Sequence, residues 1–296
     1  MRIARFVDNR PERGRGPEQW GFVNEDRVTP VRNRQSLIDV LAFDETRLVE
    51  EARHADPAIS ISDVRLLAPI PAPPQFMGIG LNYRDHAAEA GQALPASPVM
   101  FPILNNAISN PGDPIEIPPF TASVDWEAEL GVVVGRGGKD IPRAEALKHV
   151  AGYLIINDVS ARDIQMGEGQ WSRGKSFDTF KPMGPWITTT HEVGDASDLL
   201  VQLWVNDELK QSSSTSQLVF DVSDLVSLMS RALTLQPGMV ISTGTPSGVG
   251  FTREPAEFLK AGDVVTIEIE GIGRLSNPVL NSMSPAESSA TIPLSH

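Results

Sequence analysis

Residues 124–134 read VDWEAELGVVV and carry the pattern that decides the fold of the larger part of this chain. Successive side chains of a strand point to opposite faces, so Asp125, Glu127 and Glu129 share one face and the residues between them share the other. The run then continues into the apolar residues 132–134, which is typical of a buried strand. The segment therefore predicts a strand that carries several carboxylates into a buried sheet.

Outside this segment, short apolar runs bounded by turn residues outnumber helical patterns. Further strands are predicted at residues 3–7, 20–23, 76–80, 153–156, 186–190, 199–205, 239–243 and 264–269. Helices are predicted at residues 34–54, at 81–90 with Asn82 as a cap, and at 221–234. Few gaps between successive strands hold a helix, which argues against a doubly wound sheet. We therefore expect an α+β, β-rich fold.

A proline-rich segment, residues 69–74 (PIPAPP), marks a boundary along the chain. Proline disfavours both helix interiors and central strands, so a joint between two domains is expected there. The sequence predicts a small N-terminal domain over residues 1–70 and a larger domain over 71–280. Residues 281–296 are rich in Ser, Pro and Ala and are predicted to be disordered.

The composition excludes several classes of function. The 296 residues include 25 Lys plus Arg against 38 Asp plus Glu, a net charge of −13 that disfavours nucleic-acid partners. The absence of cysteine excludes a disulfide scaffold, a thiolate metal site and a cysteine nucleophile. No signal peptide or apolar run of about 18 residues is seen, so we expect a cytoplasmic protein without a membrane partner.

Three carboxylates suggest a metal site. Asp158 follows the apolar run 153–156, much as Glu127 and Glu129 precede the run 132–134. Three oxygen ligands without cysteine suit a hard cation, with Mg²⁺ or Mn²⁺ preferred and Ca²⁺ able to substitute. The alternative is that the two glutamates lie on a solvated strand face, which is the common place for charged residues.

A histidine and a glutamate lie three residues apart on the helix predicted at 81–90. At that spacing His86 and Glu89 are neighbours on one helix face. A carboxylate beside an imidazole fixes its tautomer and raises its basicity, as a general base requires. An exposed His–Glu pair without function is the alternative.

Two loops could contact an anionic substrate. Residues 243–250 (TGTPSGVG) lack the Gly-Lys-Ser/Thr of a phosphate loop and the spacing of a dinucleotide fingerprint. They form either a plain turn or a nest in which backbone amides and the Thr245 hydroxyl hold a carboxylate or enolate oxygen. Lys175, with Arg162 and Arg173 upstream, is either a solvated charge or a cation that faces the substrate. No Gly-x-Ser-x-Gly elbow supports a serine hydrolase.

Five blocks, in this order, resemble the fumarylacetoacetate hydrolase family, in particular its acylpyruvase and fumarylpyruvate hydrolase branch. They are GLNYRDHAAE (80–89), DWEAELG (125–131), NDVSARDIQ (157–165), GKSFDTF (174–180) and TGTPSGVG (243–250). The resemblance covers about residues 68–280. It implies a mixed β-sandwich roll preceded by a small N-terminal α/β domain, and a homodimer.

The resemblance also implies roles for individual residues. It assigns Mg²⁺ or Mn²⁺ to Glu127, Glu129 and Asp158, and the activation of water to His86 and Glu89. Lys175 joins the catalytic residues. Substrate contacts are implied for the remaining polar residues of the blocks, Tyr83, Arg162, Gln165 and Thr245.

The expected activity is metal-dependent hydrolysis of a C–C bond in a β-diketo acid, such as an acylpyruvate or fumarylpyruvate. The metal would stabilise the enolate, and His86 would activate a water. One alternative is a decarboxylase or isomerase of a related keto-dicarboxylate, of the oxaloacetate or 2-hydroxyhepta-2,4-diene-1,7-dioate type. Another is a non-catalytic metal-binding protein. Ile103 stands where the family often has lysine, which would shift the substrate towards a less anionic or bulkier compound.

Overall fold

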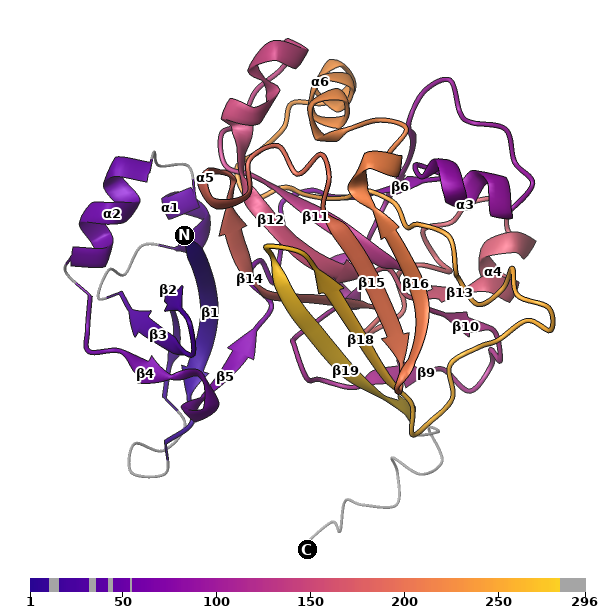
Figure 1. Ribbon diagram of the computed structural model, residues 1–296, viewed down its shortest axis with the longest axis horizontal. Helices are drawn as coiled ribbons and strands as arrows, with labels where there is room; N and C mark the ends of the chain where they lie inside the picture. The colour runs from indigo at the N-terminus through magenta and orange to yellow at the C-terminus, as the bar shows by residue number, and fades with distance from the viewer. Residues whose placement is uncertain (11–15, 32–35, 42–44, 54, 283–296) are drawn as a thin grey trace, which may run out of the picture.

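A long mixed sheet runs through the molecule and holds the acidic segment away from its edges (Figure 1). The computed structural model describes residues 1–10, 16–31, 36–41, 45–53 and 55–282. The strands of the sheet are, in order, β4 (Ile59–Ser60), β3 (Arg27–Pro30), β2 (Glu18–Asn24), β1 (Arg2–Asp8), β14 (Lys181–Thr189), β12 (Val150–Asn157), β11 (Ala128–Val134), β17 (Val240–Ser242), β6 (Phe76–Gly80) and β7 (Val99–Pro102). Two short strands pair beside β1 and β14, namely β5 (Val64–Leu67) and β8 (Ile108–Ser109).

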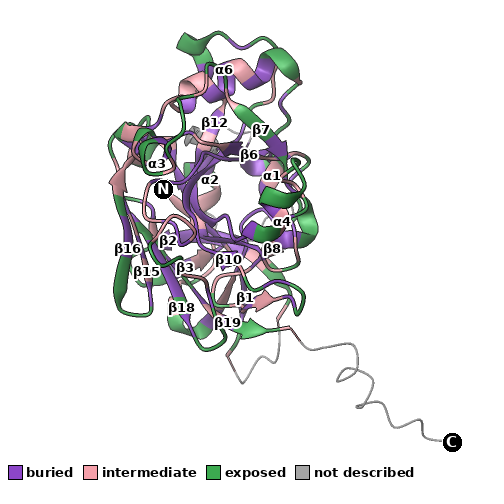
Figure 2. Cartoon of the chain, turned by 90° about the vertical axis from the view of Figure 1, so that its right-hand side faces the viewer, coloured by how far each residue is buried: buried purple, intermediate pink, exposed green. Residues whose placement is uncertain are grey.

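A second sheet packs against the first and forms a sandwich. Its strands are, in order, β16 (Glu208–Ser214), β15 (Leu200–Val205), β18 (Val264–Ile269), β19 (Gly273–Asn281) and β9 (Ile115–Ile117). Strands of this sheet contact β11, β12 and β14, and apolar side chains fill the space between the two sheets. Figure 2 shows the buried residues gathered there. The predicted α+β, β-rich sandwich is confirmed.

The N-terminal strands extend the large sheet. β1 pairs antiparallel with β14, with Ile3 opposite Ile187. The helix expected over residues 34–54 is described as two shorter ones, α1 (Leu37–Leu41) and α2 (Glu45–Arg53). The other expected positions in this helix, 34, 35, 42–44 and 54, lie outside the described residues. The domain boundary at residue 70 stays a prediction, because the two parts share one sheet.

The acidic segment is two strands instead of one. β10 (Val124–Asp125) pairs with β13 (Ser160–Ala161), whereas β11 pairs with β12. The break falls at Trp126 and Glu127, where the chain passes from one pairing partner to the other. The indole nitrogen of Trp126 donates a hydrogen bond to the carbonyl of Gly248, which anchors the break to a distant loop (3.1 Å).

The helix that carries the predicted dyad is shorter than expected. α3 (Arg84–Glu89) begins three residues late, because Leu81 adopts a left-handed conformation with φ of 54°. Asn82 does not cap it. Its side chain instead bonds to distant backbone, donating to the carbonyl of Thr243 (2.8 Å) and accepting from the amide of Phe220 (2.9 Å). Asn82 therefore ties the start of α3 to the loop after β17.

The later helix forms as predicted. The Asp221 side chain accepts a hydrogen bond from the amide of Asp224 (2.8 Å) and starts the helix with a capping box. This helix is α6 (Val222–Ala232), and the remaining α-helices of the described residues are α4 (Arg162–Gly167) and α5 (Thr190–Val193). Among the described residues, no helix has the length and apolarity needed to cross a membrane. The disordered tail expected from residue 281 starts too early, because Asn281 is the last residue of β19; from position 283 onward it lies outside the described residues.

Candidate active site

Three buried carboxylates meet beside two neighbouring strands. Glu127 precedes β11, Glu129 lies in it and Asp158 follows β12; the pairing of Ala128 with Asn157 brings them together. Each offers an oxygen within 4.8 Å of the others. Their exposed fractions are 4%, 2% and 1%, so the alternative of a solvated strand face is wrong.

Two lysines surround this acidic cluster, which we define as Glu127, Glu129 and Asp158. Nζ of Lys175 lies 2.5 Å from Oε2 of Glu127 and 2.9 Å from Oδ2 of Asp158. Nζ of Lys181 lies 2.7 Å from Oδ1 of Asp158. Burial disfavours the charge on Glu127, but the adjacent Lys175 and Arg162 outweigh it and lower its pKa to about 2. Glu127 is therefore ionised near neutral pH.

Among the described residues, Glu127 and Asp158 each form an ion pair with a lysine, whereas Glu129 forms none. It accepts a hydrogen bond from the amide of Gly244 (2.9 Å). Burial, with repulsion from Asp158 and Glu127, raises its pKa well above its usual value. A divalent cation would relieve this repulsion, and three converging oxygens suit Mg²⁺ or Mn²⁺. The cluster therefore fits a divalent metal.

The predicted histidine–glutamate contact forms, with a buried imidazole and a solvent-exposed glutamate. Nδ1 of His86 lies 3.2 Å from Oε2 of Glu89, and His86 is 8% exposed, so the imidazole is not a free surface group. The amide of Gly248 donates to Oε1 of Glu89 (2.9 Å). Burial would raise the pKa of Glu89, but the bonds from His86 and Gly248 lower it overall. An ionised Glu89 holds the proton of His86 on Nδ1 and leaves Nε2 free to accept one.

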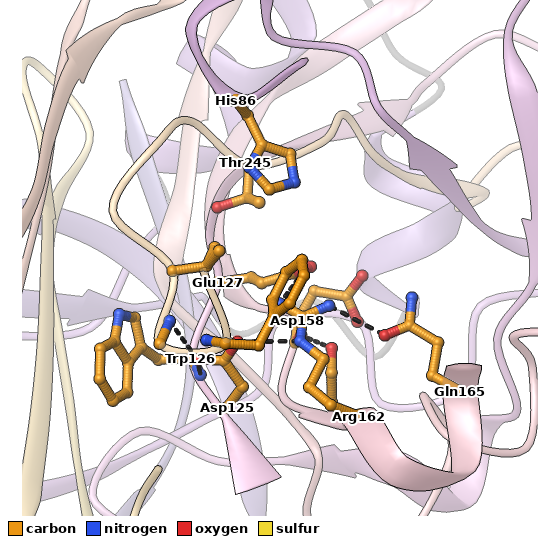
Figure 3. A network of polar contacts seen from close by, with 12 residues as sticks. His86, Asp125, Trp126, Glu127, Asp158, Arg162, Gln165 and Thr245 are labelled. Atoms are coloured by element: carbon orange, nitrogen blue, oxygen red, sulfur yellow. Dashed lines mark hydrogen bonds and ion pairs between the residues drawn. The ribbon is translucent and has the colours of Figure 1, made fainter. Parts of the chain in front are cut away.

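A single cavity joins the dyad to the acidic cluster. It encloses about 320 Å³ and is lined by His86, by all three carboxylates and by Lys175. In Figure 3, His86 faces Glu127 and Asp158 from the opposite side. A base and a metal-binding cluster thus face the same space.

Arg162 bonds to protein groups with three of its nitrogens. Its Nε donates to Oδ2 of Asp125 (2.8 Å) and its Nη2 to Oε1 of Glu127 (2.6 Å). Its Nη1 donates to Oε1 of Gln165 (2.9 Å), as Figure 3 shows. The ring of Phe251 stacks on the guanidinium, with its centroid 4.3 Å away. Arg162 and Gln165 line the cavity, but the contacts of Arg162 in the structure hold the acidic cluster in place.

The other expected substrate contacts differ in position. Thr245 lines the cavity, and its hydroxyl accepts a hydrogen bond from Nε2 of Gln211 (2.9 Å). Tyr83 is fully buried and is absent from the cavity wall; its hydroxyl has no hydrogen-bond partner among the described residues. Ile103 is a core residue outside the cavity, so the shift in substrate expected from it has no direct structural basis.

The loop at 243–250 supports the protein's own carboxylates. The amides of Gly244 and Gly248 donate to Glu129 and Glu89, and that of Gly250 donates to Asp125 (2.7 Å). These amides are therefore not available to the substrate as the nest interpretation required. One loop instead fixes the acidic cluster, the dyad and the partner of Arg162 together.

Three supporting residues were not predicted for the site. Asp125 anchors Arg162, and Lys181 approaches Asp158 from β14. Gln211 accepts from the amide of Ala128 (2.9 Å) while it donates to Thr245. A charged residue at the start of the apolar strand β14 could have indicated Lys181. Nothing local in the sequence distinguishes Gln211.

Comparison with known proteins agrees with the predicted resemblance. Residues 75–280 match the family model described as fumarylacetoacetate (FAA) hydrolase, C-terminal. The chain is 46% identical over 224 residues to the mitochondrial oxaloacetate tautomerase fahd2 of Xenopus laevis. The aligned region covers 75% of this chain and 70% of that protein.

Two solved structures are similar over nearly the whole chain. A 5-carboxymethyl-2-hydroxymuconate delta-isomerase from Mycobacterium smegmatis has a TM-score of 0.77 and 37% identity, covering 95% of this chain and 100% of that one. The maleylpyruvate hydrolase from Sphingobium sp. SYK-6, in complex with manganese(II) and pyruvate, has a TM-score of 0.78 and 29% identity, covering 96% and 100%. The chain therefore belongs to the fumarylacetoacetate hydrolase family.

Proposed function

We propose that this enzyme is a metal-dependent hydrolase that cleaves a C–C bond in a β-diketo acid of the acylpyruvate type. The observation that carries the proposal is the single cavity lined by both the acidic cluster and His86, whose Nδ1 contacts Glu89. Hydrolysis of such a bond needs a base for water and a means to stabilise an enolate leaving group. The manganese(II) and pyruvate bound to the maleylpyruvate hydrolase are consistent with this chemistry.

Glu127, Glu129 and Asp158 would hold the metal, Mg²⁺ or Mn²⁺. A divalent ion bound there supplies Lewis-acid polarisation of the keto and enolate oxygens of the substrate. Lys175 lies within hydrogen-bond distance of two of the three ligands, so its ammonium group lies where negative charge develops. Arg162 orients Glu127 through a short charge-assisted bond.

His86 would act as the general base. Its Nε2 removes a proton from water, and the oxygen of that water adds to the carbonyl carbon distal to the carboxylate. The C–C bond between that carbon and the methylene then breaks, with its electron pair forming the enolate of pyruvate. His86 returns the proton to the methylene carbon, which yields a carboxylic acid and pyruvate. Glu89 holds the imidazole through Nδ1 and stabilises its charged form.

An isomerase, tautomerase or decarboxylase of a keto-dicarboxylate is the second candidate. The similarity to an oxaloacetate tautomerase and to a delta-isomerase favours it. Such a reaction uses the same enolate stabilisation and a proton carrier such as His86, but no attacking water. The cytoplasmic location and the homodimer expected from the sequence belong to the same proposal; sedimentation equilibrium would test the dimer.

A substrate panel separates the two candidates. Acylpyruvates, fumarylpyruvate and oxaloacetate are each assayed with Mg²⁺ and Mn²⁺, and products are identified by NMR in H₂¹⁸O. We expect ¹⁸O in the carboxylic acid released from an acylpyruvate, and a loss of about 10²–10⁴-fold in kcat for His86→Ala with metal binding retained. Turnover of oxaloacetate alone, or metal binding without any turnover, would contradict the hydrolase proposal.

A further inference from the structure

We propose that the substrate carries an apolar, uncharged group on its distal carbonyl, and that Trp171 sets this preference. The inference rests on the proposed function and specifies its substrate class. In an acylpyruvate the carboxylate and the neighbouring keto oxygen lie at one end of the molecule, and the acyl group lies at the other. The cavity likewise has both charged and apolar lining residues.

The charged groups of the cavity lie at one end. Its cationic side chains, apart from His86, are Arg162 and Lys175, and both bond directly to carboxylates at or beside the acidic cluster. A divalent ion and Lys175 at this end suit the carboxylate and keto oxygens of the substrate. The anionic end of the substrate is therefore expected here.

Another part of the cavity lining is apolar and aromatic. Trp171 packs edge-on against Phe101, with ring centroids 5.6 Å apart, and both line the cavity. Two glycines of β6 make room for them. A Cβ on Gly78 would lie 2.2 Å from the ring of Phe101, and one on Gly80 would lie 2.0 Å from the ring of Trp171. Because Gly78 and Gly80 have no side chains, both rings can lie against the sheet beside the cavity.

The segment that carries Trp171 is fixed to the catalytic residues. The carbonyl of Trp171 accepts a hydrogen bond from the amide of Lys175 (3.1 Å), and the hydroxyl of Ser172 donates to the carbonyl of Pro102 in β7 (2.7 Å). The ammonium of Lys175 also lies 5.7 Å from the centroid of Phe101. The aromatic wall therefore keeps a constant place relative to the charged end.

Within the described part of the chain, the lining offers no unpaired lysine or arginine to a second carboxylate. Lys175, which lies beside Phe101, is already paired with Glu127 and Asp158, and Arg162 is paired with Asp125 and Glu127. The other lining residues include the apolar Ile79, Leu81 and Met166 and the neutral Gln92. A carboxylate placed against Trp171 and Phe101 would lose hydration without gaining an unpaired cation, which is unfavourable. An alkyl or aryl group would instead bury apolar surface against Trp171 and Phe101. The geometry thus favours an acyl group without charge over a dicarboxylate.

The test compares three 2,4-dioxo acids whose distal groups are methyl, phenyl and carboxymethyl. For the wild-type holoenzyme we expect kcat/KM for the phenyl compound to exceed that for the carboxymethyl compound by at least about 10-fold. Trp171→Ala should lower the ratio of kcat/KM for the phenyl compound to kcat/KM for the methyl compound by about 10-fold. Trp171→Arg should raise kcat/KM for the carboxymethyl compound relative to that for the phenyl compound. Trp204→Ala, in β15 outside the cavity, is the matched control and should leave both ratios unchanged.

A binding measurement separates this inference from the proposed reaction. Calorimetry of the three acids with Mg²⁺-loaded His86→Ala protein reports affinity without turnover. If phenyl binds more tightly than carboxymethyl there, while the wild-type enzyme hydrolyses none of the three, the hydrolase proposal fails and the inference stands. Tighter binding of the carboxymethyl compound, or ratios that Trp171→Ala and Trp171→Arg leave unchanged, would overturn the inference.

Discussion

The ammonium nitrogen of Lys175 lies 2.5 Å from Oε2 of Glu127 and also bonds to Asp158, so one lysine bridges two of the three carboxylates of the acidic cluster. All three residues are almost fully buried. In such a site a fixed positive charge stabilises the carboxylates, and it also repels a second cation. Lys175 therefore influences both the stability of the metal-free protein and its affinity for metal.

We predict that Lys175→Met binds Mn²⁺ about 10-fold more tightly, because a unit of repulsive charge is removed from the cluster. The same change should reduce kcat by about 100-fold, since the charge that develops on the substrate loses a partner. Isothermal titration calorimetry measures the first effect and steady-state kinetics the second.

The stability of the same variant provides an independent check. Without metal, Lys175→Met should melt at a lower temperature than the wild type, because Glu127 loses its closest ion pair. Saturating Mn²⁺ should raise its Tm by more than it raises that of the wild type. Lys210→Met is the control, as Lys210 pairs with Glu208 and Glu257 outside the cavity. Unchanged or weaker Mn²⁺ binding by Lys175→Met would contradict this view.

Replacing Glu89 by Gln should lower kcat/KM by about 10–100-fold, because the amide still accepts from Gly248 but no longer stabilises a charged imidazole. The lowered pKa of Glu89 keeps it ionised in the wild type. The loss should fall on kcat, with Mn²⁺ affinity retained, because Glu89 contacts the imidazole and not the acidic cluster.

A surface ion pair serves as the control for Glu89→Gln. Glu145 forms an i,i+3 contact with Lys148 on the surface, so Glu145→Gln should leave kcat/KM unchanged. An unchanged kcat/KM in Glu89→Gln would mean that the charge of Glu89 does not support His86.

The sequence predicts the positions of the charged residues better than their partners. Alternation in a strand places Glu127 and Glu129 on one face, and an apolar run places Asp158 at a strand end. The structure brings all three together. This succeeds because period-two alternation and strand ends are local properties of the chain. The helix predicted over residues 221–234, which forms as α6, is predicted for the same reason.

The remaining features of the site depend on residues that are distant in the sequence, and local sequence patterns do not show these partners. Asn82 has the side chain of a helix cap, yet it bonds to Thr243 and Phe220, which lie far along the chain. The tertiary contacts override the local preference. Gln211 reaches the site from the second sheet, and its position depends on how the two sheets pack. Strand pairing likewise sets the break at Trp126, which alternation alone does not show.

Arg162 and Asp125 should be strongly coupled in stability. Arg162→Met leaves Asp125 buried without a cation, which should cost about 3–5 kcal/mol. Burial already raises the pKa of Asp125 despite Arg162, so the uncompensated carboxylate is unfavourable. The double variant Asp125→Asn/Arg162→Met should recover about 1–3 kcal/mol of that loss. Urea unfolding of the four proteins measures this coupling, and additive effects would show that the pair does not act as a unit.

Gly248 should tolerate no side chain. It has φ of 100°, and a Cβ there would lie 2.1 Å from the carbonyl oxygen of Lys210, so Gly248→Ala combines backbone strain with a clash. Gly112→Ala is the matched control, because Gly112 has φ of 80° and no atom lies within 4 Å of an added Cβ. This variant should lose about 1–2 kcal/mol of stability, which is the cost of the left-handed backbone alone. Because the amide of Gly248 donates to Glu89, its variant should also lose kcat, whereas Gly112→Ala should retain it. Equal losses of stability in urea, with equal kcat, would show that the loop at 243–250 adapts freely and does not hold the dyad.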